Sequence, residues 1–407
     1  MTAEPRRRLL FLLPFPPDPD GRHGAARMTG QLLQSLARVH DVAAIYLRAP
    51  EEPAVDSALS SRLALVVEVE RPSLQGSGRT RRAARRAVGL SRGRPLWTTD
   101  WAVPAFAERL REVVQAWRPD VVQAELHIMG QYLSGLIQPT VLVEHDPGAA
   151  AATDLATWER GLRRVGRRVD AFAWRRYEPR VLASANAVVA FTEADRTALA
   201  TLAPGARVVR ISPGISIPAQ PSDPIGAQPP RVLFLGSFVH PPNIDAAIRL
   251  ARTIFPAVRA RLPGAALEIV GDAPPPEVRA LAGDGVVVTG RVADVLPYLN
   301  RAAVVAAPLR LGGGMRVKVL ESLAAGKAMV ATPRALAGLE LVPGTHALVG
   351  ESDAELSDAL VALLEHPERR RDLGDAARDW ATEHLGWEHA AAAYEQLYAT
   401  LLGGSAT

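Results

Sequence analysis

The chain has 407 residues, 48% of them hydrophobic and 22% charged, which is typical of a globular protein with about two domains. It has no cysteine, so disulfides and thiolate metal sites are excluded. The formal net charge is +4, yet residues 1–217 carry 30 arginines against 22 acidic residues, and such a basic half favours an anionic surface or substrate.

The N-terminal run "RLLFLL" is too short for a signal segment and stops at Pro14, so we expect a buried strand from Leu9 to Leu13. No later stretch is apolar over about 18 uninterrupted residues, so we expect a soluble, cytoplasmic protein. Further short apolar runs, with helical patterns between them, occur at 42–47, 121–126, 140–146 and 187–193. This alternation predicts an α/β domain with a parallel sheet that is covered on both faces.

Residues 215–230, "ISIPAQPSDPIGAQPP", lack periodicity and are rich in proline, which is typical of a linker. The strand and helix pattern then restarts, so residues 231–385 are predicted to form a second doubly wound domain after a first one at 1–214. Residues 386–407 are predicted to form a C-terminal helix. Two Rossmann-like domains in tandem imply a ligand cleft between them.

The stretch "PLRLGGGMRVKVLESLAAG" (308–326) predicts a strand, a turn of three glycines (Gly312, Gly313 and Gly314) and a helix that stops at Gly326. Glycines let backbone N–H groups approach a ligand, and a helix N-terminus favours anions. Arg316 and Lys318 add positive charge suited to phosphate. Glu321, one turn further on, can accept hydrogen bonds from the two hydroxyls of a ribose. The alternative is an ordinary glycine-rich turn with a surface Lys318–Glu321 pair.

These motifs resemble the donor-binding domain of the family 4 glycosyltransferases, which have the GT-B fold. The resemblance rests on "VLFLGSF" (232–238), "PPNIDAA" (241–247), "LEIVGD" (267–272) and the long run from "VVVTGRV" to "ALAGLE" (286–340). The first half of the chain is similar more loosely. In this family, the final helix crosses back onto the first domain.

The resemblance implies a retaining glycosyltransferase that uses a nucleotide-diphosphate sugar and needs no metal. The family's two glutamates, eight positions apart, correspond to Gly313 and Glu321, so the ribose ligand is present and the first carboxylate is missing. The N–H groups of the glycine loop would then contact the donor sugar, as in a glycine-rich branch of the family.

The family also places a basic pair after the first strand of this domain, and here those positions hold Ser237 and Pro242. Arg316 and Lys318 are therefore the candidates for neutralising the diphosphate. The resemblance assigns donor contacts to Gly21, Gly24, Gly236, Ser237, Gly271, Arg291, Val292, Gly312, Gly313, Gly314, Met315, Arg316, Lys318 and Glu321.

In the first domain, the resemblance places His145 of "TVLVEHD" near the anomeric carbon, where it would bind and polarise rather than attack. The alternative for this lone histidine is a strand-end cap. Arg22 and Arg27 follow the first strand, and Glu125 and His127 end another; all four are acceptor-side candidates. The aspartates of "DPD" (18–20) are expected to form a solvated turn, and no histidine spacing indicates a metal site.

Two arginine-rich stretches, 77–97 and 158–180, also carry apolar and aromatic residues. They are compatible with docking on an anionic membrane leaflet, with nucleic-acid contact or with a solvated helix face. No nucleic-acid-binding motif accompanies them, so no nucleic-acid partner is expected. Peripheral membrane contact remains open, as do two other functions: a catalytically silent nucleotide-sugar or partner-binding protein, and an epimerase or phosphorylase of the same fold.

Overall fold

The structure is a computed structural model that describes residues 6–21, 24–73, 79–158, 161–223, 225–311 and 316–403. The chain forms two compact units. Within the described residues, unit 1 comprises 6–214 and 387–403, and unit 2 comprises 215–311 and 316–386. The prediction of two parallel, doubly wound α/β folds is confirmed.

Unit 1 is built on a seven-stranded sheet in the order β3-β2-β1-β4-β5-β6-β7, in which every pair of neighbours is parallel. The order reverses between β1 and β4, which is where ligands bind in sheets of this kind. The strands are β1 (Arg8–Leu13), β2 (Asp41–Arg48), β3 (Leu65–Glu70), β4 (Val121–Glu125), β5 (Thr140–Glu144), β6 (Ala187–Ala190) and β7 (Val208–Arg210).

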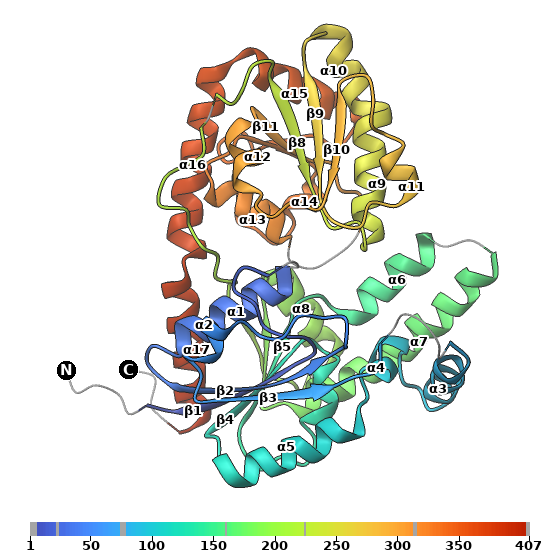
Figure 1. The fold of residues 1–407 in the computed structure, drawn as a ribbon, viewed down its shortest axis with the longest axis vertical. Helices are drawn as coiled ribbons and strands as arrows, with labels where there is room; N and C mark the ends of the chain where they lie inside the picture. Colours follow the sequence, from blue (N-terminus) through green and yellow to red (C-terminus); the bar gives the residue numbers. More distant parts are fainter. Residues whose placement is uncertain are drawn as a thin grey trace. The chain divides into compact units, whose positions relative to one another are not determined.

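Helices cover both faces of this sheet (Figure 1). The first helix α1 packs against the last helix of the chain, α17, whereas α5 lies on the other face. The helices of unit 1 are α1 (Gly24–Leu36), α2 (Ser57–Ser60), α3 (Arg79–Ser91), α4 (Leu96–Asp100), α5 (Pro104–Trp117), η1 (Met129–Tyr132), α6 (Gly148–Trp158), α7 (Gly161–Ser184), α8 (Glu193–Leu202) and α17 (Trp387–Leu401).

Unit 2 has a six-stranded parallel sheet in the order β10-β9-β8-β11-β12-β13, with its own reversal between β8 and β11. Its strands are β8 (Arg231–Leu235), β9 (Ala266–Val270), β10 (Val286–Gly290), β11 (Val304–Ala307), β12 (Met329–Ala331) and β13 (Leu348–Val349). Its helices are α9 (Pro241–Arg249), η2 (Leu250–Ile254), α10 (Phe255–Arg261), α11 (Pro276–Arg279), α12 (Leu296–Arg301), α13 (Val317–Ala324), α14 (Pro333–Leu336), α15 (Asp353–Glu365) and α16 (Pro367–Leu385).

The central strands are buried on both faces, which explains their continuous apolar sequences. The five residues Leu9–Leu13 are each at most 1% exposed. At the end of β4 the alternation is interrupted, because Leu126 has a φ of 68°, a left-handed conformation that is rare for a bulky residue. Its neighbours on either side therefore do not follow the regular strand pattern.

The proline-rich segment 215–230 belongs to unit 2 and is attached to it by hydrogen bonds. Arg378 Nη2 donates to Pro218 O at 2.5 Å, and Ser222 N donates to Ala325 O at 2.8 Å. The buried ammonium of Lys327 donates to Asp223 O and Ala302 O, both at 2.5 Å. A segment without periodicity thus has a fixed course, because side chains of later helices and turns satisfy its carbonyl groups.

Candidate functional site

Three glycines end adjacent strands of unit 2: Gly236 after β8, Gly271 after β9 and Gly290 in β10. A Cβ atom on Gly271 would lie only 1.7 Å from Gly236 O, so the two loops touch through their backbones. Gly271 N also donates to Gly290 O at 3.1 Å. A side chain at Gly271 would therefore force the loops after β8 and β9 apart, whereas a Cβ atom on Gly290 would meet nothing within 4 Å.

Lys318 of α13 reaches across to the loop after β8. Its Nζ donates to Asn243 Oδ1 at 2.5 Å, and Asn243 Nδ2 donates to Ser237 O at 2.7 Å. The ammonium also lies 4.9 Å from the centre of the Phe234 ring, a cation–π distance. A single positive charge therefore connects α13, α9 and the backbone of the Gly236–Ser237 loop.

The environment of Lys318 lowers its pKa from 10.5 to about 7, chiefly because the ammonium is removed from water and secondly because Arg316 is nearby. A bound anion would offset both effects. Lys318 thus has the properties of a phosphate ligand, since it is a point charge that is unfavourable until a negative group arrives.

Helix α13 positions the other predicted donor residues. Arg316 is its N-cap residue, and no acidic side chain lies in its first turn to repel an anion. Glu321 follows Lys318 by less than one turn and is half-buried. The helix ends as predicted, because Gly326 adopts a φ of +73°. Gly312, Gly313, Gly314 and Met315 lie outside the described residues.

Arg291 and Val292, the predicted base contacts, directly follow β10. Arg291 is exposed and Val292 is half-buried. The segment therefore lies at the same strand ends as Gly236 and Gly271, and all the described donor candidates of unit 2 come from one edge of its sheet.

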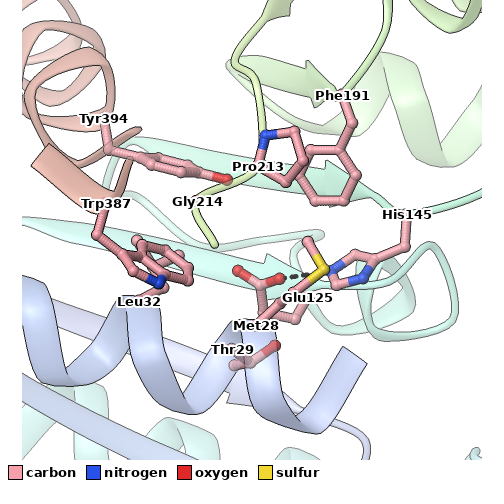
Figure 2. Close-up of a pocket in the computed structure, with 10 residues that line it drawn as sticks. All are labelled: Met28, Thr29, Leu32, Glu125, His145, Phe191, Pro213, Gly214, Trp387 and Tyr394. Atoms are coloured by element: carbon pink, nitrogen blue, oxygen red, sulfur yellow. Dashed lines mark hydrogen bonds and ion pairs between the residues drawn. The ribbon is translucent and has the colours of Figure 1, made fainter. Parts of the chain in front are cut away.

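In unit 1, His145 follows β5 and lines a pocket with Glu125 from the end of β4 (Figure 2). His145 Nε2 and Glu125 Oε2 are 2.7 Å apart, and their side chains are 10% and 2% exposed. The other residues that line the pocket are Met28, Thr29, Leu32, Phe191, Pro213, Gly214, Trp387 and Tyr394. The pocket combines one histidine–carboxylate pair with mostly apolar walls.

The structure does not bring His127 into this pocket. His127 Nδ1 pairs with Glu144 Oε2 at 2.9 Å, and the imidazole contacts Trp97 and Trp174 edge to face. Trp174 packs in the same core as Phe106 and Leu110 of α5, on the opposite face of the sheet from α1. Burial alone would lower the pKa of His127, but the nearby carboxylates, Glu144 first, together raise it above its ordinary value. This second histidine–glutamate pair is separate from the first.

The loop after β1 is organised by its own residues. Asp20 N donates to Asp18 Oδ1 at 3.0 Å and Gly21 N donates to Asp18 O at 2.9 Å, so the "DPD" sequence forms a turn. Arg27 Nη1 donates to Gly21 O at 3.1 Å. Gly24 begins α1, and Arg22 lies outside the described residues. Within the part of the chain that is described, no group of three or more histidine, aspartate and glutamate side chains is arranged to hold a metal ion.

Sequence reasoning did not single out Asn243, Gln123, Trp387 or Tyr398. A signal existed for Gln123, because a glutamine inside the buried run "VVQAEL" needs a partner. For the aromatic residues of α17 no comparable signal existed, since a tyrosine on a helix is ordinary core material.

Comparisons with known proteins identify the family of this chain. The sequence model described as "Glycosyltransferase Family 4" matches residues 22–217, and the one described as "Glycosyl transferases group 1" matches residues 229–366. The chain belongs to glycosyltransferase family 4. As a family 4 protein, it is similar to the GDP-mannose-dependent alpha-(1-6)-phosphatidylinositol monomannoside mannosyltransferase of Mycobacterium tuberculosis. The two are 34% identical over 179 residues, which are 40% of this chain and 46% of that protein. The chain thus spans about half the length of these curated relatives.

Solved structures show that a known two-domain fold extends over nearly the whole chain. Sucrose-phosphate synthase from Thermosynechococcus elongatus superposes with a TM-score of 0.75 at 18% identity, covering 98% of this chain and 100% of that one. WaaG, a glycosyltransferase involved in lipopolysaccharide biosynthesis, superposes with a TM-score of 0.66 at 17% identity, covering 97% of this chain and 100% of that one. HepE of Anabaena, solved with UDP-glucose, superposes with a TM-score of 0.64 at 13% identity, covering 97% of this chain and 100% of that one.

Proposed function

We propose that this protein is a retaining, metal-independent glycosyltransferase that takes a sugar from a nucleotide-diphosphate donor. The observation that carries the proposal is the contact between Lys318 and Asn243. It brings an ammonium group next to Pro242, a position where the family has a basic residue and this chain has none. A positive charge from α13 thus reaches the first turn of α9, where Pro242 lies.

The donor would bind along the strand ends of unit 2. The base lies against the backbone of Arg291 and Val292, and Glu321 accepts hydrogen bonds from the ribose hydroxyls. Arg316, Lys318 and the N-terminus of α13 stabilise the diphosphate, with Gly236, Ser237 and Gly271 allowing close backbone approach. The negative charge that develops on the leaving diphosphate is the charge that these preorganised groups stabilise.

Unit 1 would serve the acceptor. In the transfer, the bond between the anomeric carbon and the phosphate oxygen breaks, and a bond to the acceptor oxygen forms on the same face of the sugar. The acceptor proton passes to the leaving diphosphate, which departs as a nucleoside diphosphate. His145 binds and polarises the reacting groups, together with Gly21 of the loop after β1 and with Gly24 and Arg27 of α1.

A lipid-linked acceptor is supported by the surface of α7. Val165, Val169 and Phe172 are 58%, 47% and 59% exposed and recur at the spacing of one helix face. Arg164, Arg168 and Arg175, all exposed, flank this apolar stripe. An apolar stripe between arginines is suited to the surface of an anionic membrane. The relative from Mycobacterium tuberculosis is named for a phosphatidylinositol-based acceptor.

Arginines of α3 pair with groups of the protein itself. Arg82 and Arg86 both pair with the buried Asp100 of α4, at 2.9 and 2.5 Å. Arg85 donates to Thr99 O and Ala102 O, both at 3.1 Å. These side chains hold α3 on α4, so the proposed membrane surface is α7 and not α3. No helix in the described part of the chain is both long and apolar enough to span a bilayer.

The direct test is donor binding followed by transfer. We expect GDP-mannose, UDP-glucose or a related nucleotide sugar to raise the melting temperature of the purified protein, since a ligand of the folded state stabilises it. Glu321→Ala should abolish that shift. Release of nucleoside diphosphate in step with glycosylation of an acceptor would establish transfer, whereas binding without release would identify a silent relative. A protein that binds no nucleotide sugar would contradict both.

Membrane contact is tested with vesicles. We expect the protein to sediment with vesicles that contain anionic lipid and not with neutral ones. The double variant Val169→Ser, Phe172→Ser should lose most of this binding. The matched control is Val287→Ser, which changes a valine of unit 2 that is 46% exposed. Equal sedimentation of wild type and the α7 variant would rule out this surface.

A further inference from the structure

A chain of hydrogen bonds leads from the last helix of the protein to His145. Tyr398 Oη of α17 donates to Gln123 Oε1 at 2.6 Å. Gln123 Nε2 donates to Glu125 Oε1, also at 2.6 Å. Glu125 Oε2 in turn lies 2.7 Å from His145 Nε2. Four side chains from α17, β4 and the end of β5 are thus connected within one unit.

The amide of Gln123 gives two of these bonds a direction. The amide oxygen of Gln123 faces Tyr398, so the phenol donates to it. The amide nitrogen of Gln123 faces Glu125, so the carboxylate accepts from it. Toward an ionised Glu125 carboxylate, which can only accept, His145 Nε2 presents a hydrogen, and in the neutral form of the imidazole the lone pair then resides on Nδ1.

The side chains of this network are buried, which keeps their hydrogen bonds away from competing water. Tyr398 is 0% exposed, Gln123 1% and Glu125 2%. Burial, and secondarily the carboxylate of Glu125, raises the pKa of Tyr398 well above its ordinary value, so the phenol keeps its proton. The imidazole is also held from the side by Phe191, edge to face with ring centres 5.0 Å apart. A satisfied buried network of this kind rigidifies the groups that it joins.

We propose that Tyr398 and Gln123 are positioning residues that, through Glu125, hold His145 in the Nε2–H tautomer, with Nδ1 available to accept a hydrogen bond from a sugar hydroxyl. The chain orients the imidazole and conducts no proton, because the amide of Gln123 cannot pass one on. In this chain of hydrogen bonds, Glu125 is the direct partner of His145. This inference rests on the proposed function for its kinetic consequence, but the tautomer itself is independent of any reaction.

The tautomer is measured by 15N NMR of histidine-labelled protein, with the His145 resonances assigned by their loss in His145→Gln. In the wild type, Nε2 should resonate as the protonated and Nδ1 as the unprotonated ring nitrogen. In Tyr398→Phe and Gln123→Leu, the two tautomers should become mixed. In a transfer assay, kcat should fall about five- to tenfold, as expected for one lost hydrogen bond, with the KM for the donor unchanged.

The matched control is Tyr46→Phe. It also removes a phenol that is 2% exposed and that donates to a carboxylate, Glu68 Oε2 at 2.9 Å, but it lies on β2, away from His145. It should leave both the tautomer and kcat unchanged. An unaltered His145 tautomer in folded Tyr398→Phe and Gln123→Leu would overturn the proposal. If the wild type transfers no sugar, the proposed function fails, while the NMR result still decides for or against the chain of hydrogen bonds.

Discussion

Only two of the 47 basic residues are lysines, Lys318 and Lys327. The surroundings of both side chains shield them from water, but the two lysines have different functions. Lys327 is 0% exposed and donates to two backbone carbonyls, so its function is to hold the segment around Asp223 in place. Burial lowers its pKa to about 8. Lys318 instead donates to one side-chain oxygen at the edge of the proposed donor site. An ammonium has three hydrogens, and the compact group fits where a guanidinium would not.

The lowered pKa of Lys318 predicts how donor binding depends on pH. In the folded protein the side chain loses its proton as pH rises through about 7, so the positive charge that attracts the diphosphate is present below that value and lost above it. Affinity for an intact nucleotide sugar, whose diphosphate does not itself titrate near neutrality, should fall about tenfold between pH 6 and 8.5. Titration calorimetry measures it.

Lys318→Met is the matching variant, because it keeps the length of the side chain and removes its charge. It should bind the same nucleotide sugar weakly at both pH values. A pH profile equally steep in the variant would assign the titration to another group.

Glu178 gives a second prediction, this time about stability. Burial first, and Glu144 second, raise its pKa from 4.5 to about 7. The carboxyl accepts hydrogen bonds from Gly148 N at 2.6 Å and Ala149 N at 3.0 Å, at the start of α6. Because the folded-state pKa lies above the unfolded one, the stabilisation is complete below pH 4.5 and is lost as pH rises through 7.

The unfolding free energy of the wild type, relative to Glu178→Gln, should therefore be about 2 kcal/mol greater at pH 5 than at pH 8. Urea unfolding at the two pH values measures the difference. A difference between the two proteins that does not change with pH would show that Glu178 does not titrate in this range.

Among single residues, the sequence identified those whose residue type is uncommon at that position of the chain. His145 at a strand end and Lys318 in an arginine-rich chain were recognised in this way. The partners were not predictable, because a sequence does not state that Lys318 meets Asn243, or that Glu125 and His127 point to opposite faces of the sheet. Local contacts are easier to read from sequence: Thr192 is the N-cap residue of α8, and its side chain accepts from Asp195 N three positions on, at 3.0 Å.

At the level of elements, the glycine contact between the loops after β8 and β9 is the most constrained feature of unit 2. Gly271→Ala places a Cβ atom 1.7 Å from Gly236 O, and backbone cannot move away cheaply. We expect a loss of at least about 2 kcal/mol in unfolding free energy, together with weakened nucleotide binding. Denaturant titration monitored in unit 2 and calorimetry with a nucleotide sugar measure the two effects.

The control for this prediction is Gly264→Ala in the same unit. A Cβ atom there would have no neighbour within 4 Å, so stability and binding should hardly change. If the two variants were equally stable, the loops would have more freedom than their contact indicates.

The strands were the most predictable elements, because buried parallel strands are continuous apolar runs with polar residues at their ends. The predicted Leu9–Leu13 became β1, one residue longer at its start. The arginine-rich helices were also visible in the sequence, but not their different uses. That difference depends on Asp100, a buried acid from another helix, and only the packing of α3 on α4 shows it.

For the whole molecule, the most consequential feature is that the chain ends in the unit where it began. Helix α17 belongs to unit 1, where Tyr394, Leu397 and Tyr398 are at most 5% exposed. Trp387 Nε1 donates to Gln31 Oε1 of α1 at 3.0 Å. Residues separated by more than 350 positions thus share one core.

A chain that ends at Gly386 should consequently be damaged in unit 1 rather than in unit 2. We expect faster hydrogen exchange in peptides from α1 and β4, since each large buried side chain that is lost costs about 2–4 kcal/mol. Nucleotide binding by unit 2 should persist. A chain that ends at Gly403 is the control and should match the wild type, and faster exchange confined to unit 2 would contradict the prediction.

Leu126 bears on how this region can vary among related proteins. Its left-handed backbone places the side chain of Glu125 on one face of the sheet and that of His127 on the other. Each pairs with a residue at the end of the neighbouring strand β5, Glu125 with His145 and His127 with Glu144. Substitutions should therefore be correlated between positions 125 and 145, and separately between 127 and 144, rather than between sequence neighbours. Where a relative has restored a regular strand at position 126, both couplings should vanish together, because one backbone angle separates the two pairs.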